Sequence, residues 1–124
     1  MDTSSSIYIF EAGSTKTDVL IYKDKTKTHL SLSGFNPNRP ESNFLVELNK
    51  LSIPNTAEIH FYGSGINSTS NKLKVASLFE SKTISVNSDS LGASRALLRN
   101  SSGIACILGT GSNVFYYNGS EIID

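Results

Sequence analysis

Apolar residues occur in short clusters along the chain, and turn-forming residues separate one cluster from the next. Short apolar or alternating clusters are typical of strands, whereas apolar residues three and four positions apart are typical of a helix that buries one face. The pattern predicts strands at residues 7–11, 17–22, 27–33, 57–62, 83–86, 104–108 and 114–117, and helices at residues 41–51, 71–80 and 90–98. The order is βββαβαβα followed by a β-hairpin, which predicts an α/β fold with a mixed parallel and antiparallel sheet.

The same pattern indicates how the elements pack. The first three strands are expected to form an antiparallel meander, with Asp24 and Lys25 in the turn between the second and the third. In the first helix one face carries Phe44, Leu45, Leu48 and Leu51. In the second helix the side chains expected to be buried are Leu73, Ala76, Leu78 and Phe79.

Two glycine-rich turns, about ninety residues apart in the chain, follow apolar strands. The first turn contains Gly13, Ser14, Thr15 and Lys16, and the second contains Gly109, Thr110 and Gly111. Glycine has no Cβ, so such turns bring backbone N–H groups close to phosphate oxygens. Two of them predict that a polyphosphate is held from both sides. The alternative is that Gly13 closes a tight turn and Lys16 is a solvated cation. The P-loop pattern Gly-x-x-x-x-Gly-Lys-Ser/Thr does not occur in the sequence.

The composition and charge of the chain limit which kinds of protein and partner are plausible. With 124 residues, 38% of them apolar, the chain has the size of one domain with a real core. Eleven basic and eleven acidic residues cancel, which argues against nucleic acid or an anionic membrane as the main partner. Cys106 is the only cysteine, and its apolar neighbours are typical of a buried thiol in a reducing compartment. The polar first residues and the lack of a long apolar run predict a cytoplasmic protein.

These segments resemble a known family. The element order, with a phosphate-binding turn after the first strand, is similar to the ribonuclease-H-like half of the sugar kinase/actin/heat-shock ATPase superfamily. Within it, the chain most resembles the N-acetylglucosamine kinase and BadF/BadG/BcrA/BcrD ATPase group. The resemblance rests on three segments: residues 11–17 (Glu-Ala-Gly-Ser-Thr-Lys-Thr), residues 87–93 (Asn-Ser-Asp-Ser-Leu-Gly-Ala) and residues 109–113 (Gly-Thr-Gly-Ser-Asn).

The resemblance implies that the family fold continues beyond what this chain contains. Residues 1–102 correspond to the N-terminal ribonuclease-H-like lobe, and residues 103–124 to the first hairpin of a second lobe. Nothing in the sequence corresponds to the adenosine-binding segment or to the helix that returns to the first lobe in the family. An unfinished hairpin exposes an edge strand and apolar surface, so we expect it to favour self-association, for example as a homodimer.

The resemblance also implies roles for individual residues. Gly13, Ser14, Thr15 and Lys16 would face the phosphates of ATP, with Gly109, Thr110 and Gly111 approaching from the other side. Glu11 would help to hold Mg²⁺, although much of the superfamily has aspartate there; the alternative is that Glu11 only ends a strand. Asp89 would be the general base that accepts the proton of a sugar hydroxyl. The alternative for Asp89 is a helix cap, a role that Ser88 could take instead.

Sugar contacts are expected in two loops. Asn36 and Asn38 resemble the sugar-contacting loop of N-acetylglucosamine kinases, and Ser64 and Gly65 follow a strand that should end at the same rim. Asparagine both donates to and accepts from hydroxyl and acetamido groups, but turn chemistry explains the asparagines equally well. His29 and His60 lack the paired spacing of a metal site and are expected to be structural.

Three functions remain open on these grounds. The first is an ATP- and Mg²⁺-dependent kinase of an amino sugar, most simply N-acetylglucosamine, with the 124-residue chain alone expected to be inactive. The second is an activator-type ATPase of the same family. Such ATPases hold an iron–sulfur cluster with cysteines, and the single cysteine of this chain argues against this function. The third is a sugar- or nucleotide-sensing module without catalysis.

Overall fold

The computed structural model describes residues 6–38, 43–108 and 112–123. Its elements are β1 (Ile7–Ala12), β2 (Lys16–Lys23), β3 (Thr26–Ser33), α1 (Phe44–Lys50), β4 (Glu58–Gly63), α2 (Thr69–Ala76), β5 (Thr83–Ser88), α3 (Asp89–Leu98), β6 (Gly103–Leu108), β7 (Ser112–Tyr117) and β8 (Ile122–Ile123). The predicted order is confirmed, and β8 is an additional strand of two residues. Among these elements no helix has the length and apolar character needed to cross a membrane.

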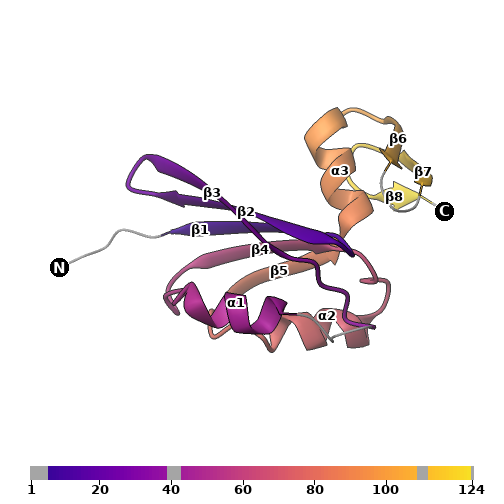
Figure 1. The fold of residues 1–124 in the computed structure, drawn as a ribbon. Coiled ribbons are helices and arrows are strands. Elements are labelled where there is room, and N and C mark those ends of the chain that lie inside the picture. The colour runs from indigo at the N-terminus through magenta and orange to yellow at the C-terminus, as the bar shows by residue number, and fades with distance from the viewer. Residues whose placement is uncertain (1–5, 39–42, 109–111, 124) are drawn as a thin grey trace.

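A five-stranded mixed sheet forms the larger part of the molecule, with strand order β3-β2-β1-β4-β5. The predicted meander is confirmed, because β2 pairs antiparallel with both β1 and β3. Strand β4 pairs parallel with β1, and β5 pairs parallel with β4. Helices α1 and α2 lie on one face of this sheet (Figure 1). The parallel pair β1–β4 lies in the interior of the sheet, and β5 extends it to one edge.

The turn between β2 and β3 forms the tip of a long hairpin that extends away from α3 (Figure 1). Asp24 and Lys25 both have positive φ, at 50° and 65°. Two consecutive residues of positive φ match the right-handed twist of the flanking strands, and they usually favour asparagine and glycine. Both side chains are exposed.

Phenylalanine rings from the sheet, the helices and one loop form the centre of the core. Phe10 and Phe61, neighbours on β1 and β4, have ring centroids 5.7 Å apart. Phe44 from α1 and Phe35 from the loop after β3 lie 4.8 Å apart, and Phe79 completes the group 5.3 Å from Phe10. Such ring pairs add about 0.5–1.5 kcal/mol each beyond the area they bury. The cluster thus ties the loop that carries Phe35 to the sheet.

Helix α2 differs from the prediction in both its limits and its buried face. It begins at Thr69, because the Ser68 hydroxyl accepts a hydrogen bond from the Asn71 backbone N–H at 3.1 Å and caps the helix. The expected burial of Leu73 was wrong, since this side chain is 65% exposed. Val75 is fully buried in its place. The helix is therefore rotated so that Asn71 and Val75, four positions apart, face the core while Leu73 faces solvent.

The second sheet has three antiparallel strands in the order β6-β7-β8 and lies beside α3 (Figure 1). Its inner face buries Ala105 and Tyr117. The opposite face exposes four large apolar side chains, namely Ile104, Val114, Tyr116 and Ile123. Cys106 pairs with Val114 across the strands and is exposed as well, so the expectation of a buried thiol was wrong. The strand buries only alternate residues, because nothing in the described ranges packs on its outer face.

We predict that the two faces of α2 respond differently to truncation. Val75→Ala should lower the free energy of unfolding by about 2 kcal/mol, since buried methyl groups are removed and a cavity remains. Leu73→Ala should change it by less than about 0.5 kcal/mol, because the side chain is largely in solvent. Urea unfolding followed by circular dichroism measures both values. Equal losses for the two variants would contradict the rotation of α2 described above.

Candidate functional site

Three neighbouring parallel strands end on the same row of the sheet. Ala12 at the end of β1 is the register partner of Gly63 at the end of β4, and Gly63 is the partner of Ser88 at the end of β5. The residues that follow directly are Gly13, Ser64 and Asp89, one from each predicted functional segment. In α/β sheets, ligands bind at the carboxyl ends of the strands. The fold therefore brings these three segments to one edge.

The first glycine turn offers free hydrogen-bond donors. The Gly13 N–H donates to the Lys16 carbonyl at 2.9 Å and closes the turn between β1 and β2. The N–H groups of Ser14 and Thr15 have no acceptor among the described residues, and both side chains are exposed. Adjacent unpaired amides form a concave donor surface for anions. Lys16 adds a positive charge, which lies 3.7 Å from Asp18.

The loop after β3, which also carries Asn36 and Asn38, supports this turn through two residues to which the sequence pattern assigned no role. The Gly34 N–H donates to the Thr15 carbonyl at 3.2 Å, and the Phe35 N–H donates to the Gly13 carbonyl at 3.0 Å. A Cβ on Gly34 would lie 2.4 Å from the carbonyl oxygen of Ser14. Only glycine allows this approach of the two backbones. Because Phe35 is also part of the aromatic cluster, the core holds the turn in place.

Carboxylates lie next to the turn on the face of the sheet opposite α1 and α2. Glu11 is exposed, and its register partner on β2 is Asp18. Glu11 has no hydrogen bond or ion pair within the described ranges, whereas Asp18 also contacts His29 at 3.3 Å. Carboxylate oxygens suit Mg²⁺, which keeps several waters as ligands. The donor set therefore fits magnesium, although the described residues contain no group of three or more metal-binding side chains.

Asp89 is the first residue of α3, and its side chain is half-buried. The capping role belongs to Ser88, whose hydroxyl accepts from the Leu91 N–H at 3.3 Å. Asp89 itself forms no hydrogen bond or ion pair with any described residue, so its carboxylate is available. Its place at the start of the helix favours negative charge there.

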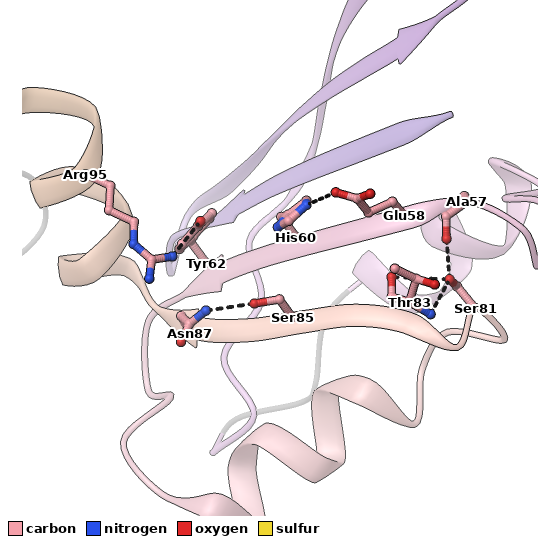
Figure 2. Close-up of polar contacts among 9 residues, drawn as sticks. All are labelled: Ala57, Glu58, His60, Tyr62, Ser81, Thr83, Ser85, Asn87 and Arg95. Carbon is pink, nitrogen blue, oxygen red and sulfur yellow. Dashed lines mark hydrogen bonds and ion pairs between the residues drawn. The ribbon is translucent and has the colours of Figure 1, made fainter. Parts of the chain in front are cut away.

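The position of α3 depends on its contact with β4. A Cβ on Gly92 would lie 2.8 Å from the Tyr62 ring, so glycine lets the helix lie directly against this side chain. Figure 2 shows Arg95 of α3 reaching Tyr62, and its guanidinium donates to the Tyr62 hydroxyl at 3.2 Å. These contacts fix the start of α3, and with it Asp89, relative to the end of β4.

The four residues expected to contact a sugar come together from two loops. The Asn36 side chain accepts from the Asn38 N–H at 2.8 Å. Gly65 has φ of 75°, and a Cβ there would lie 2.4 Å from Oδ1 of Asn36. The Ser64 N–H donates to the Ala12 carbonyl at 2.9 Å, while its buried hydroxyl has no partner among the described residues. Each loop therefore contacts the other, and the second also contacts the end of β1.

A cavity of about 460 Å³ lies next to these loops and is largely polar. The residues that line it are Ile66, Asn67, Ser68, Thr69, Lys72, Asn87, Ser88, Leu91, Glu121 and Ile122. It is thus formed by the start of α2, the end of β5, α3 and β8. Gly65 and Asp89 are direct sequence neighbours of lining residues, but neither they nor Asn36, Asn38 and Ser64 line the cavity.

A solved structure resembles the chain over nearly its whole length. It is a protein from Porphyromonas gingivalis whose N-acetylglucosamine kinase activity is itself a proposed assignment. The two share 34% sequence identity with a TM-score of 0.75, over 94% of this chain and 46% of the other. The resemblance to an N-acetylglucosamine kinase that the sequence motifs indicate is confirmed by this match. It resembles the N-terminal half of that kinase and spans about half of its length.

Other comparisons add less. The PPX-GPPA enzyme of Aquifex aeolicus has 8% identity and a TM-score of 0.40, over 98% of this chain and 51% of that one. YeaZ from Pseudomonas aeruginosa has 9% identity and a TM-score of 0.41, over 99% and 65% of the two chains. These scores are too low to support an argument. No family model and no curated protein matches the sequence.

Some family positions predicted from the sequence are not tested by the structure. Gly109, Thr110 and Gly111 of the second glycine turn lie outside the described residues. That the two glycine turns face each other across a cleft therefore stays a prediction. His60 pairs with Glu58 along β4 (Figure 2), and His29 pairs with Asp18, so each histidine has a carboxylate partner.

We predict that the first glycine turn depends on Gly34, the glycine behind it. Gly34→Ala should lower the free energy of unfolding by about 1–3 kcal/mol, because the new methyl group overlaps the backbone of Ser14. Gly13→Ala is the matched control: its Cβ would lie 3.3 Å from the Lys16 carbonyl oxygen, so the loss should be smaller. Thermal and urea unfolding measure both. A larger loss for Gly13→Ala would show that the bracing by Gly34 is misassigned.

Proposed function

We propose that this chain is the N-terminal half of an ATP-dependent kinase that transfers the γ-phosphoryl group to a hydroxyl of an amino sugar, with N-acetylglucosamine as the best candidate. The observation that carries the proposal is the shared row on which β1, β4 and β5 end, followed directly by Gly13, Ser64 and Asp89. The relationship to the Porphyromonas gingivalis protein supports the choice of sugar.

Phosphoryl transfer requires positioning and charge stabilisation more than covalent chemistry from the protein. In this proposal the free N–H groups of Ser14 and Thr15 donate to phosphate oxygens, and Lys16 offsets their charge. Glu11, with Asp18 beside it, would hold Mg²⁺, and the ion would supply positive charge against the charge that develops on the phosphate oxygens. Gly109, Thr110 and Gly111 are proposed to complete the phosphate site.

Asp89 is the proposed general base. Its carboxylate takes the proton from the attacking sugar hydroxyl while that oxygen forms its bond to the γ-phosphorus and the bond to the β-phosphate oxygen breaks. Two features support this role. Ser88 caps the helix instead of Asp89, and no described residue forms a hydrogen bond or ion pair with the Asp89 carboxylate. A base must be free to approach the substrate, and Asp89 meets this condition.

The sugar is proposed to bind between the loops that carry Asn36, Asn38, Ser64 and Gly65. The unpaired hydroxyl of Ser64 supports a polar ligand here, because an unsatisfied buried hydroxyl costs about 1–3 kcal/mol. Asparagine amides match the carbonyl and N–H of an acetamido group. We propose that adenosine is bound by the other half of the complete protein, so this chain alone should show little or no turnover in a coupled assay.

Replacing Asp89 tests the proposal in the complete protein. Asp89→Asn should lower kcat by about 10²- to 10⁴-fold, because amide nitrogen and oxygen cannot accept the proton. Binding of N-acetylglucosamine, measured by calorimetry, should be retained. Asp24→Asn at the hairpin tip is the control of equal charge change and should leave kcat unaltered. Full turnover by Asp89→Asn, or phosphorylation of no amino sugar by the unmodified protein, would refute the assignment.

A further inference from the structure

Asn71 connects the two loops proposed to bind the sugar, although it belongs to neither. It lies in the first turn of α2 and is only 6% exposed. Its Nδ2 group donates one hydrogen bond to Oδ1 of Asn38 at 3.1 Å and another to the Gly65 carbonyl at 2.6 Å. The two acceptors come from different loops, so a single buried amide holds both.

The connection extends to the remaining residues of the two loops. Asn38 is bonded through its N–H to the side chain of Asn36, and that side chain in turn packs against Gly65. Asn71, Asn38, Asn36 and Gly65 therefore form a closed ring of contacts. Removing the Asn71 amide would break both hydrogen bonds through which α2 joins the two loops and would leave the packing of Asn36 on Gly65.

Position 71 requires a side chain that donates two hydrogen bonds, and asparagine meets this requirement. A primary amide supplies two N–H donors from one nitrogen, and both are used here. The backbone N–H of Asn71 is bonded to the Ser68 hydroxyl, so the helix cap fixes the point from which the side chain extends. Aspartate has the same shape but only acceptor atoms when ionised. It would face two oxygen acceptors and place an unpaired charge in a buried site.

We propose that Asn71 is the positioning residue that locks the Asn36–Asn38 loop and the Ser64–Gly65 loop into one arrangement, and thereby sets the affinity for the amino sugar. This inference rests on the proposed function for its substrate. Asn71 acts through Asn38 and Gly65, because its burial leaves almost none of its side chain for direct contact with a ligand.

The first experiment tests the lock without any ligand. Asn71→Asp is compared with the unmodified 124-residue chain by amide hydrogen exchange in NMR. Exchange at Asn38 and Ser64 should rise at least tenfold, while exchange in β2 and β3 stays unchanged. Asn49→Asp, the same substitution at an exposed position of α1, is the control and should change neither. Unaltered exchange at Asn38 and Ser64 in Asn71→Asp overturns the proposal.

A second variant guards against loss of folding. Asn71→Ser introduces no charge and keeps one hydroxyl donor, so it should give an intermediate rise in exchange with a native circular dichroism spectrum. If Asn71→Asp does not fold, Asn71→Ser decides the question by the same comparison. Loop exchange in Asn71→Ser equal to that of the unmodified chain then counts against the lock.

The second experiment tests the consequence for binding in the complete protein. Asn71→Ser should raise the Kd for N-acetylglucosamine at least tenfold, while the Kd for Mg·ATP changes less than twofold, because the phosphate turn is held by Gly34 and Phe35 instead. Equal weakening of both ligands would indicate general destabilisation and overturn the specific role. If the unmodified protein binds no amino sugar, the proposed function fails, and the exchange experiment still decides whether Asn71 locks the loops.

Discussion

The parallel pairing of β1, β4 and β5 is the constraint on which the rest of the molecule depends. The register places Ala12, Gly63 and Ser88 on one row, so three chain segments must leave the sheet at the same edge. Polar and glycine-rich residues follow each of these strands, and none of them could meet if one strand ran in the opposite direction. A shift of the register by one residue would also turn the core side chains of that strand outward.

Two close approaches of the backbone, each at a glycine, hold the segments of the candidate site at this edge of the sheet. Gly34 lets one loop lie against the first glycine turn, and Gly92 lets α3 lie against Tyr62. Behind them, Phe35 carries the position of the loop into the aromatic cluster. Core packing and the geometry of the candidate site depend on each other, because the same short segment contributes a ring to the core and two N–H groups that bond to the first glycine turn.

The sequence predicted the features that depend on local pattern. Element order, the antiparallel meander and the strand ends follow from apolar spacing and turn residues, which act within a few positions of the chain. The orientation of Leu73 was missed because the buried face of α2 carries the polar residue Asn71 together with Val75, and a pattern of apolar residues does not reveal such a face. Cys106 was missed because an apolar run looks the same in a strand covered on one face or on two.

The residues that organise the candidate site were beyond such reasoning for a different reason. Asn71 and Asn38 are 33 positions apart, and their contact exists only after α2 has come to lie beside the loop that follows β3. An asparagine in the first turn of a helix carries no local sign of this role. Likewise, the need for glycine at position 92 arises from a tyrosine thirty residues earlier in the chain. Only the folded backbone makes these dependencies visible.

The turn at Asp24 and Lys25 has a practical consequence. It lies at the free end of a hairpin that projects away from α3 (Figure 1), and its side chains are in solvent. Exposed loop tips of this kind tolerate inserted polypeptide well. An epitope tag or a fluorescent reporter placed there would follow the protein in purification and in cells while leaving its chemistry untouched.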